Sequence, residues 1–326
     1  MNDILIDVKN LTKRFPIKGG LWGRTVGHVN AVNNISFSIK RGETLGLVGE
    51  SGCGKSTLGR TLLRLIEPTS GEVFFNGENV TTMEREKLRS MRKKMQIIFQ
   101  DPYASLNPRM TVGEILAEPL LIHKLVKHKA DIQKEIFKLF DYVQIPKDAI
   151  NKYPHEFSGG QRQRICIARA LAVRPEFIVC DEPVSALDVS VQAQVVNLLM
   201  DLQKEFKLTY LFIAHDLKVV EFISNRVAVM YLGNMVEMAD AADLYHMQAH
   251  PYTKSLISAI PVPDPHHKKE RIILEGDVPT PLNPPSGCHF HPRCWKKTDE
   301  CSATYPAIES IGHEHEFRCH HPLHLS

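Results

Sequence analysis

Apolar and polar residues follow two different patterns in the first eighty positions. From Ile35 to Ile39 they alternate, which is typical of a strand with one solvated face. The segment TLGLV at 44–48 is continuously apolar, as buried strands of parallel sheets are. The segment GEVFFNG at 71–77 predicts a short hairpin strand between two glycines. This part of the chain therefore predicts a half-exposed antiparallel strand next to a buried one.

The middle of the chain has helical periodicity. Helices are predicted within residues 84–96 and 130–143, and a third from about 191 to 206. In the third helix one apolar stripe is formed by Val191, Val195, Leu198, Leu199 and Leu202. Buried strands are expected in FIVCDE, 177–182, and YLFIAHD, 210–216. Alternating strands and helices predict a parallel α/β fold interrupted by a helical insertion.

The composition changes after about residue 240. The stretches 261–270 and 277–288 are rich in proline and polar residues, which is typical of loops and linkers. We therefore predict a main domain over 1–240 and a C-terminal extension over 241–326.

Composition and charge exclude several classes of protein. The chain has 326 residues, 43% hydrophobic and 24% charged, with a net charge of +3. This charge is too small for a typical nucleic-acid binder, so no nucleic-acid partner is expected. Neither a signal peptide nor a run of about 18 apolar residues for a membrane span is recognisable. The expected location is the cytoplasm, where cysteines stay reduced.

Residues 49–57, GESGCGKST, follow a predicted buried strand and precede a predicted helix. They fit the phosphate-binding pattern G-x-x-x-x-G-K-[ST] in its expected context. Backbone N–H groups of such a loop surround phosphates, Lys55 would reach the β- and γ-phosphates, and the Ser56 hydroxyl would bind Mg²⁺. The predicted ATP-binding residues of this loop are Gly49, Glu50, Ser51, Gly52, Cys53, Gly54, Lys55, Ser56 and Thr57.

Two further segments complete the predicted ATP chemistry. Asp181 and Glu182 end a buried strand, where Asp181 would hold Mg²⁺ and Glu182 would orient or deprotonate the attacking water. In FSGGQRQR, 157–164, Ser158 is a good N-cap, so this helix start is a second anion site. The predicted phosphate contacts there are Ser158, Gly159, Gly160 and Gln161. A second such site indicates a dimer in which each helix start meets the partner's ATP.

These motifs together resemble the ATP-binding subunits of ABC transporters. FSGGQ resembles the family's LSGGQ motif, and SALD at 185–188 resembles its D-loop. The resemblance implies that Gln100 belongs to the Q-loop and contacts Mg²⁺, that His215 senses the γ-phosphate, and that Phe15 stacks on adenine. It also implies an ABC cassette with a RecA-like parallel-sheet core, an antiparallel β subdomain and a helical subdomain at about 101–165.

The C-terminal part narrows the resemblance to the peptide/nickel importer group. HPYT at 250–253, PPSGC at 284–288 and the terminal cysteines are similar to dipeptide and oligopeptide importer ATPases, most of all the F-type subunit. The group implies a heterodimer with a related ATPase and two membrane permeases, which the helical insertion at roughly 101–156 would touch. It also implies a peptide-binding protein and a location on the cytoplasmic face of a bacterial inner membrane.

Alternative functions remain open at this point. The substrate could be a dipeptide, a longer oligopeptide, a haem-like molecule or a nickel complex. A soluble ABC ATPase usually has two cassettes or a long coiled coil, and this chain shows neither. An exporter ATPase is disfavoured by the resemblance of the C-terminal part, and a non-catalytic module by the presence of Lys55, Asp181, Glu182 and His215.

Four cysteines are concentrated near the end of the chain, at Cys288, Cys294, Cys301 and Cys319. In a reducing compartment such a group predicts metal binding rather than disulfides. Four thiolates suit a [4Fe–4S] cluster, which the resemblance also implies, whereas zinc sites usually contain closer cysteine pairs. Neighbouring histidines, at 289, 291, 313, 315, 320 and 321, keep a zinc site open, and a metal-free segment is the third alternative. We favour an iron–sulfur cluster with a structural role.

Overall fold

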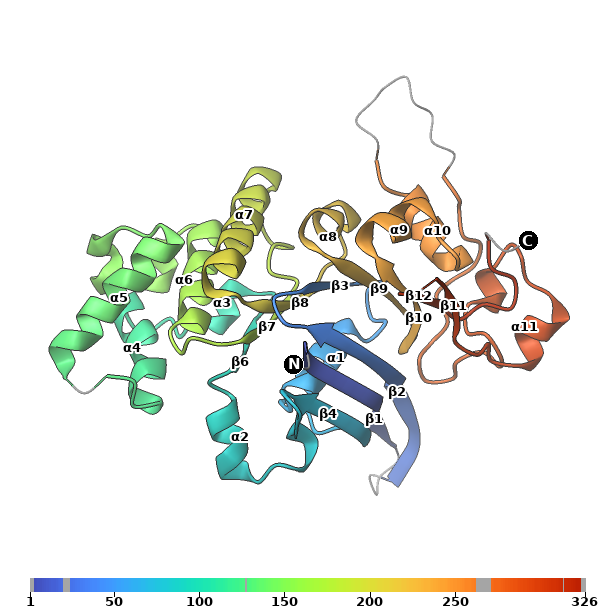
Figure 1. Cartoon of the computed structure of the whole chain (residues 1–326), viewed down its shortest axis with the longest axis horizontal. Helices are drawn as coiled ribbons and strands as arrows, with labels where there is room; N and C mark the ends of the chain where they lie inside the picture. Colours follow the sequence, from blue (N-terminus) through green and yellow to red (C-terminus); the bar gives the residue numbers. More distant parts are fainter. Residues whose placement is uncertain (1–2, 20–23, 127, 262–270, 313, 324–326) are drawn as a thin grey trace. The chain divides into compact units, whose positions relative to one another are not determined.

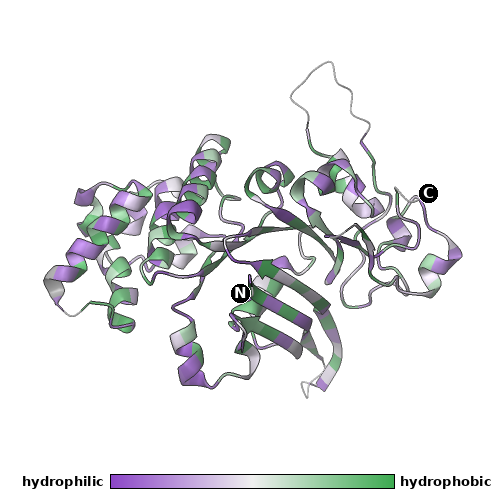
Figure 2. Cartoon of the chain, in the orientation of Figure 1, coloured by the Kyte–Doolittle hydropathy of each residue, from purple (hydrophilic) through white to green (hydrophobic). Residues whose placement is uncertain are grey.

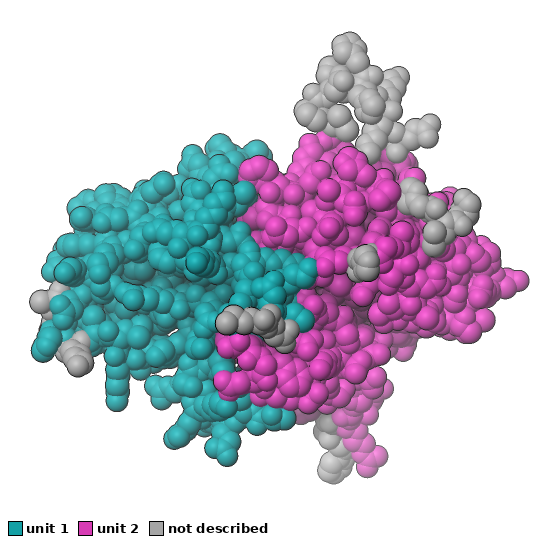
Figure 3. All heavy atoms as spheres, viewed as in Figure 1, with its two compact units in different colours: residues 1–5, 39–43, 82–214 teal, residues 6–38, 44–81, 215–326 magenta. Residues whose placement is uncertain are grey.

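The computed structural model describes residues 3–19, 24–126, 128–261, 271–312 and 314–323. The chain divides into two compact units (Figure 3). Unit 1 contains Met1–Leu5, Ile39–Glu43 and Thr82–Ala214, and unit 2 contains Ile6–Ser38, Thr44–Thr81 and His215–Ser326. The predicted boundary at residue 240, between a nucleotide-binding domain and a C-terminal extension, differs from this division into units and stays a prediction.

Unit 1 combines three parallel strands with a group of helices (Figure 1). The strands lie in the order β6 (Met95–Ile98), β7 (Phe177–Asp181) and β8 (Thr209–Ile213). Every residue of β7 and β8 is buried, as their continuous apolar sequences predict. Sequence predicted the strands β7 and β8 but missed β6, because Met95 and Gln96 were assigned to the end of a helix.

Helices make up the rest of unit 1. They are α2 (Arg85–Met91), α3 (Pro102–Ser105), α4 (Val112–Ile122), α5 (Lys129–Val143), α6 (Gly159–Leu171) and α7 (Val189–Phe206), with single turns at Lys147–Asn151 and Pro154–Glu156. The α5 helix packs against α4 and α6, and α6 also packs against α7. The predicted stripe of α7 is confirmed at Val195, Leu198, Leu199 and Leu202, which are buried. The 84–96 helix was predicted too long, since α2 ends at Met91.

An antiparallel sheet lies largely in unit 2. Its strand order is β2 (Arg24–Lys40), β1 (Ile4–Gly19), β4 (Ser70–Phe75) and β5 (Glu78–Asn79). The alternation predicted from Ile35 to Ile39 is confirmed, because Ile35, Phe37 and Ile39 are buried whereas Ser36 is exposed. Figure 2 shows the resulting bands of opposite hydropathy along these strands.

The phosphate-loop strand of unit 2 belongs to a second group of strands. Its order is β11 (Glu309–Ile311), β12 (His315–Phe317), β10 (Asn234–Asp240), β9 (Arg226–Tyr231) and β3 (Thr44–Val48). The β3 and β9 strands are parallel, and the other neighbouring pairs are antiparallel. The helices of this unit are α1 (Lys55–Leu62), α8 (Leu217–Ile223), α9 (Ala241–His246), α10 (Pro251–Ser258) and α11 (Asp299–Ala303), with single turns at Val80–Thr82 and His291–Arg293. Within the described ranges, no helix has the length and apolar character needed to cross a membrane.

The C-terminal residues are more ordered than their composition predicts. The α9 helix follows residue 240 directly, α10 begins at Pro251, and β12 pairs with β10. Most of the proline-rich stretch at 261–270 lies outside the described residues, whereas 277–288 contains neither helix nor strand. The sequence pattern missed β11 and β12 because strands of three residues are too short to show a period.

A buried carboxylate joins three C-terminal elements. Glu237 of β10 is 1% exposed and accepts hydrogen bonds from the backbone N–H groups of Ala249 (2.6 Å) and His250 (2.9 Å). Its Oε1 also lies 2.7 Å from Nε2 of His315 in β12. A buried polar group of this kind is tolerated only when its oxygens are hydrogen-bonded. Glu237 therefore fixes the start of α10 and the last strand to the same point.

Protonation of His250 should destabilise this region in mild acid. His250 caps α10, because its Nδ1 accepts a hydrogen bond from the N–H of Tyr252 at 3.0 Å. Burial lowers the pKa of His250 from 6.5 to about 4, against the opposing effect of Glu237. The unfolded chain binds a proton at this histidine more tightly than the folded chain does. The stabilisation of the fold by neutral His250 is therefore present above pH 6.5 and is lost as the pH falls towards 4.

We expect His250 to contribute about 2 kcal/mol to the loss of unfolding free energy between pH 7 and pH 5. Urea denaturation at the two pH values would measure the loss for the native chain and for His250→Asn, which keeps a capping oxygen but cannot titrate. The variant should lose about 2 kcal/mol less than the native chain. An equal loss in both proteins would contradict this role.

Candidate functional site

The predicted phosphate loop forms a tight turn between β3 and α1. All five residues of β3 are buried, and α1 begins at Lys55 directly after Gly54. Gly49 and Gly54 have φ angles of 151° and 109°, which only glycine adopts at low cost. A Cβ atom at Gly49 would lie 2.2 Å from the carbonyl oxygen of Met230, and one at Gly54 1.9 Å from that of Ala31. The loop thus requires glycine for both conformation and space.

Lys55 lies within the loop that it is predicted to serve. Its side chain is buried, and Nζ donates hydrogen bonds to the carbonyl oxygens of Gly49 (2.8 Å) and Glu50 (3.0 Å). The ammonium group is therefore held at the inner side of the turn, where a phosphate would meet it. Cys53 is 4% exposed, and burial raises the pKa of its thiol. The thiol is thus protonated at neutral pH and unreactive, as expected for a position where any small residue suffices.

Unit 1 brings two predicted catalytic residues together. Asp181 is the last residue of β7 and is fully buried, and Glu182 follows it with a φ of 49°. The backbone N–H of Glu182 donates to the carbonyl oxygen of Ile213 at the end of β8, at 3.0 Å. Its Oε2 accepts a hydrogen bond from Nε2 of Gln100 at 3.1 Å. The structure therefore joins the candidate base to the candidate Q-loop glutamine.

The FSGGQ segment forms the expected helix start. Ser158 caps α6, where its Oγ accepts from the N–H of Gln161 (3.3 Å) and its own N–H donates to Oε1 of Gln161 (3.0 Å). This reciprocal pair is a capping box. Phe157, which replaces the usual leucine, is 7% exposed and belongs to the core. Ser158, Gly159 and Gln161 are exposed, so the helix start is open to a ligand or partner.

The adenine and γ-phosphate candidates are both accessible. Phe15 in β1 is 36% exposed, and Nζ of Lys13 lies 4.9 Å from the centre of its ring. His215 is exposed and belongs to unit 2, next to Asp216, whose Oδ1 caps α8 by accepting from the N–H of Lys218 at 2.9 Å. The cap fixes the backbone beside His215. The roles of both residues stay predictions.

The four C-terminal cysteines lie around one small cavity but do not form a metal site. Cys288, Cys294, Cys301 and Cys319 all line this cavity, together with His250 and His291 among others. Among the described residues, no group of three or more His, Cys, Asp or Glu side chains is arranged to hold a metal ion. The prediction of an iron–sulfur cluster or a structural zinc in this segment was therefore wrong.

The four thiols lie in partly or fully buried surroundings. Burial raises the pKa of Cys288 to about 11 and that of Cys319 to about 12, and it also raises the pKa of Cys294. These three thiols are therefore protonated at neutral pH. Cys301 is 7% exposed and Cys319 is packed with Ala249 and Phe317. Cys301 and Cys319 therefore pack as small buried apolar residues, whereas Cys288 and Cys294 are half-buried.

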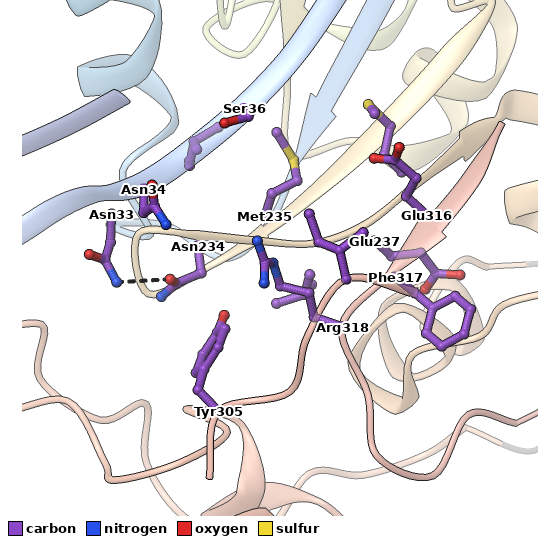
Figure 4. Close-up of a pocket in the computed structure, with 14 residues that line it drawn as sticks. Asn33, Asn34, Ser36, Asn234, Met235, Glu237, Tyr305, Glu316, Phe317 and Arg318 are labelled. Atoms are coloured by element: carbon purple, nitrogen blue, oxygen red, sulfur yellow. Dashed lines mark hydrogen bonds between the residues drawn. The ribbon is translucent and has the colours of Figure 1, made fainter. Parts of the chain in front are cut away.

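A separate cavity of about 130 Å³, with both polar and apolar lining residues, lies between β2, β10 and β12 (Figure 4). Nδ2 of Asn33 donates to Oδ1 of Asn234 across one end of it, at 3.0 Å. Arg318 lies beside Tyr305 at another part of the wall, 5.7 Å from the ring centre. None of the predicted site residues lines this cavity.

Two family descriptions match the chain. "ABC transporter" matches residues 32–185, and "Oligopeptide/dipeptide transporter, C-terminal region" matches residues 236–301. The oligopeptide transport ATP-binding protein AppF of Bacillus subtilis is 50% identical over 98% of this chain and 97% of its own length. The chain belongs to the ABC transporter ATP-binding proteins.

Further relatives and solved structures agree with this family. The putative oligopeptide transport ATP-binding protein YkfD of Bacillus subtilis is 56% identical over 90% of this chain and 89% of its own. The cassette MJ0796, in a dimeric post-hydrolysis state with ADP and Pi, is 28% identical with a TM-score of 0.65, covering 73% of this chain and 99% of that one. CbiO1 of Clostridium perfringens, described as part of the complex cbiONQ, is 25% identical with a TM-score of 0.64, over 75% of this chain and 91% of its own.

These matches confirm the ABC cassette fold and the ATPase assignment. The names of the two Bacillus subtilis relatives describe ATP-binding proteins and neither describes an iron–sulfur protein, in agreement with the absence of a metal site at the four cysteines among the described residues. The appended Cys-rich extension stays a prediction.

Sequence reasoning missed two residues that contact the phosphate loop. The N–H of Glu50 donates to the hydroxyl oxygen of Tyr252 at 2.9 Å, and the guanidinium of Arg293 binds the Glu50 carboxylate. Both partners lie more than 200 positions from Glu50 in the sequence. Neither a tyrosine nor an arginine by itself indicates a contact with a phosphate loop. Arg293 also lies among the cysteines that the sequence predicted to be metal ligands.

A tight contact behind the FSGGQ helix gives a test of stability. A Cβ at Gly160 would lie 2.4 Å from Cγ1 of Val191 in α7, whereas one at Gly159 would lie 3.3 Å from Cδ2 of Leu187. We expect Gly160→Ala to lower the free energy of unfolding by about 1–3 kcal/mol through overpacking. Gly159→Ala, the matched control, should change it by less than about 0.5 kcal/mol. Urea denaturation would measure both, and equal effects would contradict the packing argument.

Proposed function

We propose that this chain is the ATP-hydrolysing subunit of an ABC importer for dipeptides or oligopeptides. The observation that carries the proposal is the 50% identity, over nearly the whole of both chains, to an oligopeptide transport ATP-binding protein. The match of residues 236–301 to the C-terminal region of oligopeptide/dipeptide transporters supports the same substrate class. Residues 241–326 would then be a segment specific to this group of importers.

In this proposal the phosphate loop binds ATP. Its glycines bring the backbone N–H groups close to the phosphates, Lys55 neutralises phosphate charge, and Phe15 stacks on adenine. The hydroxyl of Ser56 and the carboxylate of Asp181 are oxygen ligands of the kind that Mg²⁺ prefers, and the Gln100 side-chain oxygen is another. When bound, Mg²⁺ would offset negative charge on the phosphates.

Hydrolysis depends on Glu182 as the base that orients and deprotonates water. The hydrogen bond from Gln100 to Glu182 supports this role, because it fixes the carboxylate at the end of β7 and links it to the Q-loop. His215 would donate to the γ-phosphate.

A second ATPase subunit would complete each site. The exposed start of α6, with Ser158, Gly159 and Gln161, supports binding to a phosphate held by the partner. We propose a related chain as the partner, so that ATP binding closes the heterodimer and hydrolysis opens it. MJ0796, which has a similar fold, is described as dimeric with ADP and Pi.

Membrane permeases would bind the helical part of unit 1. The end of α4 and the following turn expose three apolar side chains, Leu121 (54%), Ile122 (51%) and Leu125 (41%). Apolar groups exposed together on a surface often mark a protein contact. The chain would thereby be held peripherally at the cytoplasmic face of the membrane, and a separate binding protein would deliver the peptide to the permeases.

Glu182→Gln should retain ATP binding and lose hydrolysis. The amide cannot accept the proton from water, so we expect ATP turnover by the assembled transporter to fall about 100- to 1,000-fold. Phosphate release would measure turnover, and calorimetric titration with ATP would measure binding. Glu205→Gln, an exposed carboxylate on α7, is the control and should leave both unchanged. Turnover near the native value in Glu182→Gln would remove Glu182 from the base role.

Carboxylates introduced at the exposed apolar end of α4 should prevent assembly of the transporter. With Leu121→Asp and Ile122→Asp together, we expect the chain to bind ATP but no longer to co-purify with its permeases, since an unpaired carboxylate would be buried in the contact. Leu65→Asp, at a side chain that is 45% exposed in unit 2, is the control. Uptake of labelled dipeptides and oligopeptides should fail only in the α4 variant. Native co-purification of that variant would place the permease contact elsewhere.

A further inference from the structure

A salt bridge joins the phosphate loop to the cysteine-containing segment within unit 2. Nη1 of Arg293 lies 2.8 Å from Oε2 of Glu50, and Nη2 lies 3.1 Å from Oε1. This is a bidentate pair, in which two parallel hydrogen bonds fix both the distance and the orientation of the carboxylate. The Arg293 side chain is 8% exposed and the Glu50 side chain 25%. The pair is therefore shielded from solvent much more than an ordinary surface ion pair.

An aromatic cluster supports the pair. Tyr231, Tyr252 and Phe290 are almost fully buried, and their ring centres lie 4.7–5.4 Å apart. The hydroxyl oxygen of Tyr252 accepts from the backbone N–H of Glu50 at 2.9 Å. The side chain and the backbone of Glu50 are thus both held by residues that follow the cassette core in the sequence.

Arg293 is placed by the turn that the first two C-terminal cysteines enclose. Arg293 ends the single helical turn His291–Arg293, between Cys288 and Cys294. The carbonyl oxygen of Cys288 accepts from the N–H of His291 at 2.9 Å, and the N–H of Cys294 donates to the carbonyl oxygen of His291 at 3.2 Å. Because the backbone turn is closed at both cysteines, the guanidinium is presented in a fixed direction.

The pair has an electrostatic consequence for the loop. Glu50 contributes a negative charge to a loop that would receive the highly charged phosphates of ATP. Arg293 neutralises that charge in a partly buried environment, where charges interact more strongly than in water. The carbonyl oxygen of Glu50 also accepts from Nζ of Lys55 at 3.0 Å. Glu50 is therefore the point at which the loop lysine and the distant arginine are connected.

We propose that Arg293 is a positioning residue for nucleotide binding: it neutralises Glu50 and holds it in the orientation that the phosphate loop needs. This inference rests on the proposed binding of ATP by the loop. It gives the C-terminal segment a direct part in ATP affinity, in addition to any role that it has in the peptide transporter.

Removing the positive charge tests the proposal. In the purified full-length chain, Arg293→Met should raise the Kd for Mg-ATP about tenfold, because the Glu50 carboxylate is then unpaired beside the phosphates. Arg293→Lys, which keeps the charge but loses the bidentate geometry, should have a Kd between those of Arg293→Met and the native chain. Isothermal titration calorimetry with Mg-ATP would measure each value.

A double variant separates positioning from general destabilisation. Glu50→Gln together with Arg293→Met removes both charges, so its Kd should lie closer to the native value than that of Arg293→Met alone. Arg318→Met makes the same chemical change in the same segment, at a side chain that lies beside Tyr305 (Figure 4) and donates to the carbonyl oxygen of Pro306 at 3.4 Å. Its Kd should equal the native value.

Three results would overturn the inference. They are an equal Kd in Arg293→Met and Arg318→Met, a double variant that binds no better than Arg293→Met, and Arg293→Lys no better than Arg293→Met. If Arg293→Met does not fold, the Kd values of Arg293→Lys and of the double variant are compared with that of the native chain. Arg293→Lys should have a higher Kd than the native chain, and an equal Kd would overturn the inference. Failure of the native chain to bind Mg-ATP would instead contradict the proposed function.

Discussion

The phosphate loop has no room for side chains on the face that contacts the surrounding backbone. The carbonyl oxygens of Ala31 and Met230 lie where Cβ atoms of Gly54 and Gly49 would be. The carbonyl oxygen of Cys53 accepts from the N–H of Gly233 at 2.9 Å, in the turn between β9 and β10. The loop is thus fixed by its neighbours as well as by its own glycines. This constraint makes β2 and the β9–β10 turn part of the proposed nucleotide site, although neither carries a recognised motif.

The same turn connects the loop to the C-terminal segment. After the turn, Nδ2 of Asn234 lies 2.9 Å from Nδ1 of His289. Before the turn, the ring of Tyr231 packs on that of Phe290. Further along β10, the buried Glu237 binds both the start of α10 and His315. One hairpin therefore supports the phosphate loop on one side and the C-terminal segment on the other. Deleting that segment would expose the aromatic cluster and leave Glu237 without one of its partners.

The sequence predicted those parts of the structure that depend on residues adjacent to one another in the chain. The glycine loop, the acidic end of β7 and the capped start of α6 each depend on adjacent residues, and all three form as expected. Contacts between distant residues could not be predicted in this way. The pairing of β12 with β10 and the contact between Arg293 and Glu50 each depend on how the whole of unit 2 packs. The strand β6 was missed because its four residues follow a charged helix with little interruption.

The prediction of a metal site at the cysteines was wrong for a different reason. Spacing along the chain indicated four convergent ligands, and the four cysteines do line one cavity, but among the described residues no three His, Cys, Asp or Glu side chains are arranged to hold a metal ion. The residues between the cysteines matter more to the described structure than the thiols themselves. Phe290 completes the aromatic cluster and Arg293 reaches Glu50. A segment that composition marks as an accessory is therefore in direct contact with the loop proposed to bind ATP, so the two should be treated as one functional region.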